Sequence, residues 1–213
     1  MNQDADLALT QPTLRTDVRF KSVEWDDGSF TPPLYYGYGF GYFLGSAPWF
    51  GIRVEFRHQK VIARTNQSYP ARGMLDGQTV DRNIRLDEIV QDLEVTHGLN
   101  TASVAFIGRC GLNETSEFTR GRTQVYGGLG TGVTISHTDS TVRESTFPSS
   151  YRIGSTPLFE AFAGARFHAT RKLYGLVEYK MIRIHVDAPV VGGLVNVVFR
   201  THQVTLGLGL SFP

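Results

Sequence analysis

The sequence predicts an all-β protein in which residues 1–213 form a single outer-membrane domain, a closed antiparallel eight-stranded transmembrane up-and-down barrel. Three observations predict this fold. Apolar residues recur at every second position in several segments. The positions between them carry glycines, charges and amides, which a soluble sheet would leave facing water while burying the apolar face. The connections alternate between short and long, as they do in outer-membrane barrels.

The stretch from Trp49 to Ala63 shows the alternation most clearly. Its positions 50, 52, 54 and 56 are apolar and share one face of a strand. The opposite face carries Gly51, Arg53, Glu55 and Arg57. Because lipid is the simplest surrounding for such an apolar face, we expect this strand to turn its charges toward the centre of a barrel.

Six further segments alternate in the same way and are expected to be strands: 34–44, 100–110, 124–136, 158–169, 173–184 and 201–212. Each has about 10 to 14 residues, and a tilted strand needs ~9–11 residues to cross a bilayer. Residues 45–48 and 170–172 are short turns, and 111–121 is intermediate. The long connections are 65–97, 137–156 and 185–199. This order places the C-terminus on the side of the short turns.

An even strand count requires one strand before Leu34. Residues 5–10 or 16–24 supply part of it, but neither segment has the pattern of a full crossing, so we expect a first strand that is short, incomplete or missing. Within the connection 65–97, apolar residues at helical spacing predict a short amphipathic helix over about 83–93. These residues are Leu86, Ile89, Val90 and Leu93.

Composition excludes several classes of protein. Lys and Arg number 21 against 20 Asp and Glu, so a nucleic-acid partner is not expected. Mean hydropathy is −0.16 and apolar runs are short, so no helix is expected to span a bilayer. The single cysteine, Cys110, excludes an internal disulfide framework and a multi-thiolate metal site. The residues after Met1 lack the features of an export signal, so we expect a removed signal or a truncated start.

Six clusters follow one another along the chain: VEWDDGSFTPPLYYG (23–37), WFGIRVEFRHQKVIA (49–63), THGLN (96–100), YGGLGTGV (126–133), VEYK (177–180) and the glycine-alternating final strand. As an ordered set they resemble a family of small outer-membrane barrels from alphaproteobacteria that includes the lipid A oxidases. The resemblance implies a location in the bacterial outer membrane and lipid A as the partner. It also implies oxidation of the proximal glucosamine of lipid A to an aminogluconate unit, with molecular oxygen as co-substrate and peroxide released.

Five residues at the expected outer rim are candidates for this chemistry. His58 and Lys60 share the outward register of residues 50–56 but lie past its apolar end. The lysine can pair with a lipid A phosphate, and the histidine can exchange protons or bind a metal near neutral pH. His97 and Asn100 enter the next strand at this level, and His137 leaves the strand after it. Three histidines at one rim suit a divalent metal of unknown identity or acid–base catalysis.

Seven charged residues point to the barrel interior by parity: Arg53, Glu55, Arg57, Glu160, Arg166, Glu178 and Lys180. Charges of both signs in a narrow lumen must pair, so a structural network is the expected role. Glycines 128, 130 and 132 have a strand period with no helix after them, which indicates close packing and not a phosphate-binding loop. Interfacial aromatic girdles are expected from Tyr35, Tyr36, Tyr38, Trp49 and Trp25.

The same sequence patterns also fit other interpretations. The rim residues also fit interfacial anchors and separate loop-stabilising histidines. A non-catalytic barrel with a structural or loop-binding role is the main alternative to an enzyme. A lipocalin-like barrel needs an apolar cavity, whereas the expected inward positions are glycines and ions. No histidine precedes a serine by two residues, the pattern expected of outer-membrane lipid A deacylases. The sequence does not indicate an oligomeric state.

Overall fold

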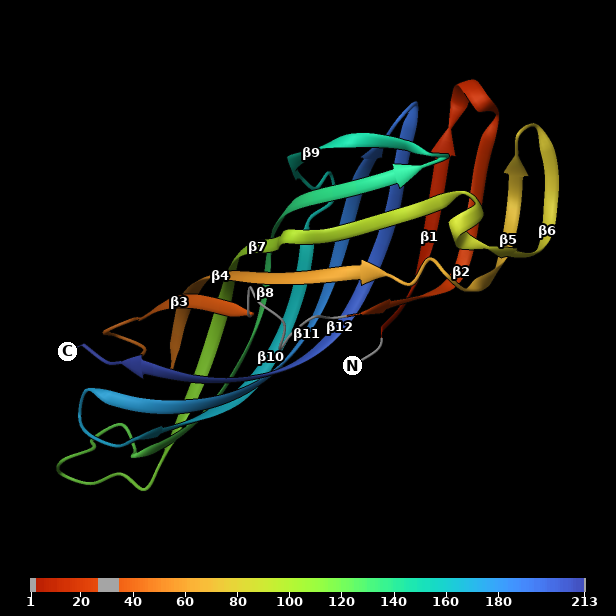
Figure 1. Cartoon of the computed structure of the whole chain (residues 1–213). Helices are drawn as coiled ribbons and strands as arrows, with labels where there is room; N and C mark the ends of the chain where they lie inside the picture. The colour runs from red at the N-terminus through yellow and green to blue at the C-terminus, as the bar shows by residue number, and fades with distance from the viewer. Residues whose placement is uncertain (1–2, 27–34, 213) are drawn as a thin grey trace.

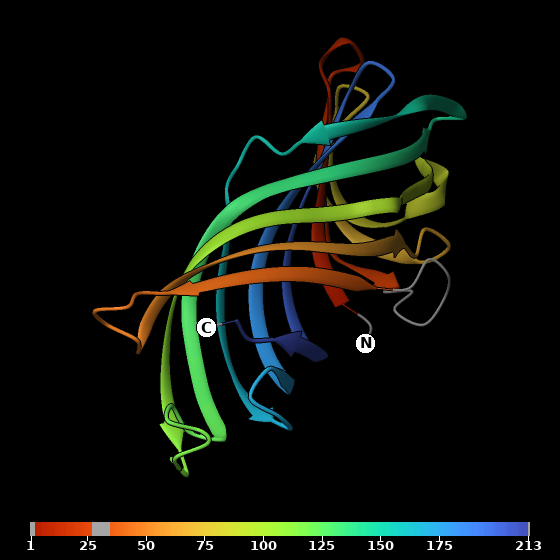
Figure 2. The same cartoon turned by 90° about the vertical axis from the view of Figure 1, so that its left-hand side faces the viewer.

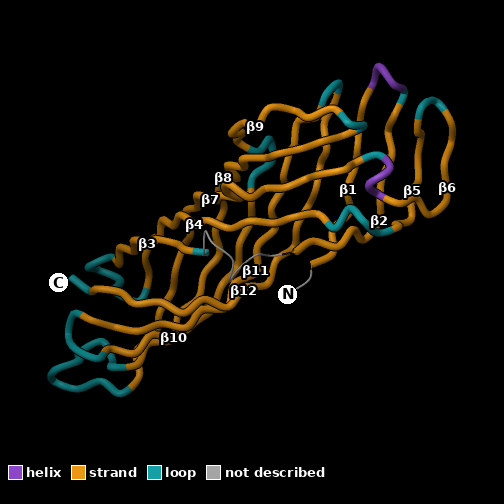
Figure 3. Tube along the Cα trace, in the orientation of Figure 1, coloured by secondary structure: helices purple, strands orange, loops and turns teal. Residues whose placement is uncertain are grey.

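The computed structural model describes residues 3–26 and 35–212, and most of these residues lie in β-strands (Figures 1 and 3). Two short 3-10 turns, Pro12–Leu14 and Leu86–Glu88, interrupt them. The strands are β1 (Gln3–Gln11), β2 (Thr16–Asp26), β3 (Tyr36–Phe43), β4 (Phe50–Ala63), β5 (Ser68–Leu75), β6 (Gln78–Arg85), β7 (Val90–Leu112), β8 (Thr123–Val142), β9 (Ser145–Ile153), β10 (Leu158–His168), β11 (Leu173–Val190) and β12 (Gly193–Leu210).

All the strands belong to one antiparallel sheet that closes on itself. The pairing order is β3-β4-β7-β8-β10-β11-β12-β1-β2-β5-β6, and β9 pairs with β8. Trp25 and Asp26 of β2 also pair with Ala63 and Ile62 of β4, which closes a ring of eight strands. The ring consists of β1, β2, β4, β7, β8, β10, β11 and β12. Figure 2 shows these long strands curving side by side.

The polarity of the ring inverts along its strands, and β12 shows this directly. Phe199 is fully buried, as are Val195 and Val197, whereas Leu206 and Leu208 on the opposite register are 81% and 83% exposed. The inward register continues past Phe199 as threonine, glutamine and glycine. The outward register is mixed up to this level, with Leu194, Asn196, Val198, Arg200 and His202, and it is wholly aliphatic from Val204 to Leu210. The sheet therefore encloses an apolar interior at one end and a polar interior at the other.

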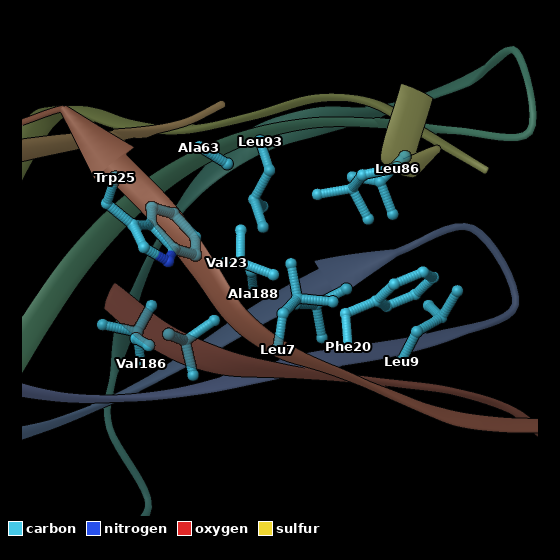
Figure 4. Packing of buried hydrophobic residues seen from close by; sticks show 14 of the residues in the cluster. Leu7, Leu9, Phe20, Val23, Trp25, Ala63, Leu86, Leu93, Val186 and Ala188 are labelled. Atoms are coloured by element: carbon cyan, nitrogen blue, oxygen red, sulfur yellow. The ribbon is translucent and has the colours of Figure 1, made fainter. Parts of the chain in front are cut away.

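We call the end with the apolar interior the upper barrel. Its core is built from β1, β2 and the distal parts of the long strands, together with Leu86 of the 3-10 turn (Figure 4). Trp25 and Phe199 meet edge to face there, with ring centroids 4.9 Å apart. Burying large side chains of this kind contributes roughly 1.5–3 kcal/mol each. The upper barrel thus has the core of an ordinary water-soluble barrel.

We call the other end the lower wall: residues 36–43, 50–58, 99–112, 123–135, 158–168, 173–181 and 201–210. Its exposed side chains are large and apolar on every strand, including Phe40, Val54, Phe106, Leu129 and Phe159. Glycines and ionised groups face inward, as the sequence predicts, and a small apolar cluster of Ala105, Ile107, Tyr126 and Phe162 lies among them. Its strands are paired from β3 through to β12. Among the described strands, β3 pairs with β4 alone, so β3 and β12 leave facing edges without a partner.

Several expectations from the sequence are wrong. Residues before 34 supply two ring strands, β1 and β2, where one short or incomplete strand is expected. The strand expected at 34–44 is present as β3, but it lies outside the ring. The long connections 65–97, 137–156 and 185–199 consist mainly of strands that build the upper barrel. Their alternation has apolar residues inside and polar residues outside, the reverse of the lower wall, so a search for an apolar exterior passes over them.

The expected helix over 83–93 is also wrong. Residues 83–85 end β6, a single 3-10 turn follows, and β7 begins at Val90. Leu86, Ile89 and Leu93 nevertheless all face the apolar core, being at most 5% exposed. A turn between two strands places these three side chains on one side. Over so short a stretch, helical spacing of apolar residues does not distinguish such a turn from a helix. Trp25 is likewise not a girdle residue, because it is 1% exposed inside the upper barrel.

No helix among the described residues combines the length and hydropathy needed to cross a membrane.

Candidate functional site

The candidate residues of the outer rim lie where the lower wall meets the upper barrel, on β4, β7 and β8. His58 of β4 is the cross-strand partner of Asn100 on β7, and Asn100 is the partner of Ile135 on β8. His58 continues the outward register of Ile52 and Val54, which are 43% and 46% exposed. The apolar exterior ends at this row, so the site lies on the outer face at the level where the polarity inverts.

His58 is held in one orientation. Its Nδ1 lies 2.8 Å from Oδ1 of Asn100, and its ring stacks on Tyr36 of β3 at 4.9 Å with 16° between the planes. An amide oxygen only accepts, so Nδ1 carries the proton and donates it to Asn100. Nε2 then holds the lone pair of the neutral ring, and it has no hydrogen-bond partner among the described residues. This arrangement presents a base or a ligand atom, with the other ring nitrogen fixed as in many catalytic and metal-binding histidines.

Lys60 follows His58 by two residues and lies at an irregularity of β4, where the pairing with β7 shifts between Gln59 and Val61. The side chain is only 5% exposed, and the Tyr35 hydroxyl donates to the Lys60 carbonyl. A lysine that snorkels to a bilayer edge keeps its amine in water. The structure therefore places Lys60 in a more enclosed position than that of an interfacial anchor.

The three rim histidines are not brought into one described cluster. The side chain of His97 lies outside the described residues. His137 on β8 is half-buried and packs against Tyr151 of β9, with ring centroids 4.5 Å apart. Within the described part of the chain, no three His, Cys, Asp or Glu residues are grouped to hold a metal ion. The described contacts thus join His58 to Asn100 and Tyr36, and they join His137 to a different strand.

The predicted interior charges form a network inside the lower wall. Lys180 is fully buried, and its Nζ lies 3.0 Å from Glu160 and also contacts Glu55. Glu178 accepts from Arg53 and, at 3.1 Å, from Arg57. Three cations and three carboxylates therefore balance one another. Since each carboxylate contacts at least one cation, this set has the arrangement of a structural ion-pair network.

Arg166 does not join this network. Its guanidinium carbon lies 4.8 Å from the ring centroid of Tyr126 and 5.1 Å from that of Tyr174. Both aromatic residues are on strands that flank β10. The parity of β10 predicts its inward direction but not its partners, because these depend on which strands become neighbours.

Sequence reasoning missed a second outward pair at the same level on the opposite wall. The Nδ1 atom of His202 on β12 lies 2.5 Å from the hydroxyl oxygen of Tyr179 on the neighbouring strand β11. His202 shares the outward register of Leu206 and comes just before the aliphatic run. His202 occupies the same alternate positions of the strand as these aliphatic residues, and this shared register is the sequence signal that could have identified it as outward-facing.

No protein-family model matches this sequence, and no match is found among curated proteins. The resemblance to the barrel family with lipid A oxidases therefore stays a hypothesis.

Proposed function

We propose that this protein is an integral barrel of the bacterial outer membrane, with the lower wall in lipid and the upper barrel outside it. The observation that supports this most is the inversion of polarity along single strands. Each half suits a different surrounding. Apolar side chains turn inward in the upper barrel, as expected in water, and outward in the lower wall, as expected in lipid. The short turns 45–48 and 170–172 then face the periplasm, and the upper barrel faces the cell exterior.

A wall in lipid must satisfy its backbone hydrogen bonds internally, so the edges of β3 and β12 need a partner. The six antiparallel pairings from β3 to β12 make these two strands run in the same direction. One strand running the opposite way is therefore antiparallel to both. We propose that a further strand occupies this position and closes the lower wall, as the even strand number of such barrels requires.

We further propose that the outer rim acts on lipid A. The headgroup of a lipid in the outer leaflet lies at the level of His58, and the sequence resemblance supplies the reaction. A proximal glucosamine with a free anomeric hydroxyl, together with water and molecular oxygen, gives the aminogluconate and hydrogen peroxide. Two electrons pass from the anomeric carbon to oxygen. In this scheme, His58 Nε2 accepts the hydroxyl proton and Asn100 holds the ring in the required tautomer.

Lys60 would balance the negative charge of the headgroup next to this base. Because the described residues contain no group of three metal ligands, we derive no step through a metal ion.

A second candidate function is a non-catalytic barrel that presents its exterior to a partner. The enclosure of His58, which is only 7% exposed, favours it. So does the β5–β6 hairpin, whose outer strand pairs with β5 alone among the described strands.

Mass spectrometry of lipid A decides between the two functions. We expect lipid A from cells that express the wild-type protein to gain one oxygen atom, and His58→Ala and Asn100→Ala to lose this product. His185→Ala, on the outer face of the upper barrel, is the matched control and keeps it. An unchanged spectrum with and without the gene, while the protein is present in the outer membrane, would remove the enzymatic proposal and leave the non-catalytic barrel.

A further inference from the structure

The lower end of the lumen carries two arginines beyond those that the ion-pair network balances. Arg109 of β7 and Arg166 of β10 share the ring of Phe43, with guanidinium carbons 3.6 and 5.6 Å from its centroid. Neither forms an ion pair with a described carboxylate. Glu55, Glu160 and Glu178 are engaged by Arg53, Arg57 and Lys180. The two arginines therefore add positive charge that the described interior does not neutralise.

Polar atoms without partners surround these arginines. Arg109 Nη2 and Arg166 Nε are buried and have no hydrogen-bond partner among the described residues. The same holds for His168 Nε2 and Gln124 Oε1, and these two side chains are 6% and 3% exposed. Leaving a buried polar atom unsatisfied costs about 1–3 kcal/mol, and more where it is charged. The three nitrogens can donate, whereas Gln124 Oε1 only accepts, so three donors at one end of the lumen lack an acceptor among the described residues.

These atoms line one space. Arg109, Arg166, His168 and Gln124 all border one open space of about 2110 Å³. It includes the lower lumen and also reaches the outward-facing Phe40, Leu206 and Leu208 on β3 and β12. Gln124 and Arg166 are cross-strand partners, and the ring of His168 lies 5.2 Å from that of Tyr174, over which Arg166 also lies. Exposed Arg120, Arg171 and Lys172 also line this space, and together they outnumber the exposed Glu117 beside them. Such a focused field raises the local concentration of anions.

We propose that this end of the lumen is a binding site for a phosphate group. A phosphate has acceptor oxygens in several directions, and the donors here come from different strands and not from one planar fork. Arg109 Nη2 and Arg166 Nε donate to its oxygens, and so does His168 in the tautomer that carries its proton on Nε2. Phe43 and Tyr174 hold the two guanidinium groups in place through their ring faces. The site lies at the short-turn end, away from the His58 rim, and it does not depend on the lipid A proposal.

Binding of inorganic phosphate to the folded, detergent-solubilised protein tests the site, measured by calorimetry at constant ionic strength with chloride as the reference anion. We expect Arg109→Gln and Arg166→Gln each to weaken binding at least about tenfold, since each removes a charge-assisted hydrogen bond. Arg183→Gln, an exposed outward position on the upper barrel, is the control and should bind as the wild type does. No phosphate binding by the folded wild type, or equal binding by both lumen variants, would overturn the proposal.

A measurement on the wild type keeps the test valid if a variant does not fold. Phosphate should slow the modification of Arg109 and Arg166 by phenylglyoxal and leave Arg183 unaffected. Equal rates with and without phosphate contradict the site. Dihexanoyl phosphatidic acid serves as a second probe. Tighter binding of this lipid than of inorganic phosphate identifies a lipid headgroup as the source of the phosphate, and weaker or equal binding identifies a free phosphate.

Discussion

Phe199 and Leu206 lie on the same strand, yet Phe199 is fully buried inside the ring and Leu206 is 81% exposed on its outer surface. Phe199 belongs to the inward register and is typical of the upper barrel, whereas Leu206 belongs to the outward register and is typical of the lower wall. The inversion needs no bend or break in the chain, because alternate side chains of a strand point to opposite faces throughout. One continuous sheet can therefore present an apolar exterior in its lower wall and a polar exterior in its upper barrel.

A charge on the outer face of the lower wall should destabilise the inserted protein. Leu206→Arg is expected to lower the free energy of unfolding by about 2–4 kcal/mol if the residue lies near the middle of the bilayer. Val191→Arg is the matched control, since this exposed valine lies in the turn at the far end of the upper barrel. Urea unfolding in phospholipid vesicles measures both. Equal stability of the two variants would contradict the assignment of the lower wall to lipid.

The interior network should be sensitive to the loss of its central cation. Lys180→Met leaves buried carboxylates without their shared partner, which typically costs about 3–5 kcal/mol. The double variant with Glu160→Gln should regain part of this loss. Lys21→Met removes the exposed ion pair with Asp6 and should cost no more than about 1 kcal/mol. Denaturant titrations compare these variants, and similar losses for Lys180 and Lys21 would exclude a central role for the network.

The tautomer of His58 can be observed directly. Nitrogen NMR of labelled protein should show the neutral ring protonated on Nδ1, since Asn100 accepts from that nitrogen. Asn100→Leu keeps the approximate volume but removes the acceptor, and it should produce a mixture of tautomers. A wild-type ring protonated on Nε2 would contradict the role assigned to Asn100, whatever the outcome of the lipid A experiment.

The upper barrel should lose stability in acid partly through Asp187. Burial opposes ionisation of this carboxyl, but hydrogen bonds from the Ser155 hydroxyl and amide and from Asn196 hold its pKa below the ordinary value of 3.8. A depressed pKa in the folded state contributes stability that is present above about pH 4 and is lost as the pH falls below it. Asp187→Asn should flatten the pH dependence of unfolding in that range.

Asp92 provides a contrast of opposite sign. Burial and the nearby Asp139 raise the pKa of its carboxyl. Its ionisation therefore works against folding as the pH rises through the raised value, and Asp92→Asn should stabilise the protein near pH 7. Denaturant unfolding of both variants from pH 3 to 7 measures these effects, and matching pH profiles for the two would contradict the assignments.

The facing edges of β3 and β12 predict a pattern of hydrogen exchange. In protein taken from native membranes, amides of residues 201–210 should exchange as slowly as those of β10, which is paired on both sides. Residues 78–85 of β6 form a free edge of the upper barrel and should exchange faster. Exchange in residues 201–210 as fast as in β6 would show that no further strand covers this edge.

The sequence predicts the structure best where a whole segment has a single surrounding, either lipid or water, because its alternation then keeps one sense. The alternation in 201–212 predicts both the strand and its outward leucines, and the parity of Arg53 and Glu178 predicts that they face the interior. It failed where two solvents share a strand. Val186 and Val197 carry the opposite alternation, so the pattern predicts a long connection over 185–199, although these residues contribute to the core of the upper barrel. The unbalanced Arg109 and Arg166 depend on neighbouring strands, which local patterns do not specify.

Spin-label accessibility at Leu206 tests the central claim most directly. With Cys110→Ala as background, labels are placed at residues 206 and 191 of the folded protein in vesicles. The proposal predicts that the label at 206 collides more often with oxygen, which is enriched in lipid, than with water-soluble nickel ethylenediaminediacetate, and that the label at 191 shows the reverse. A label at 206 that is more accessible to the nickel complex than to oxygen would contradict a lower wall embedded in the membrane.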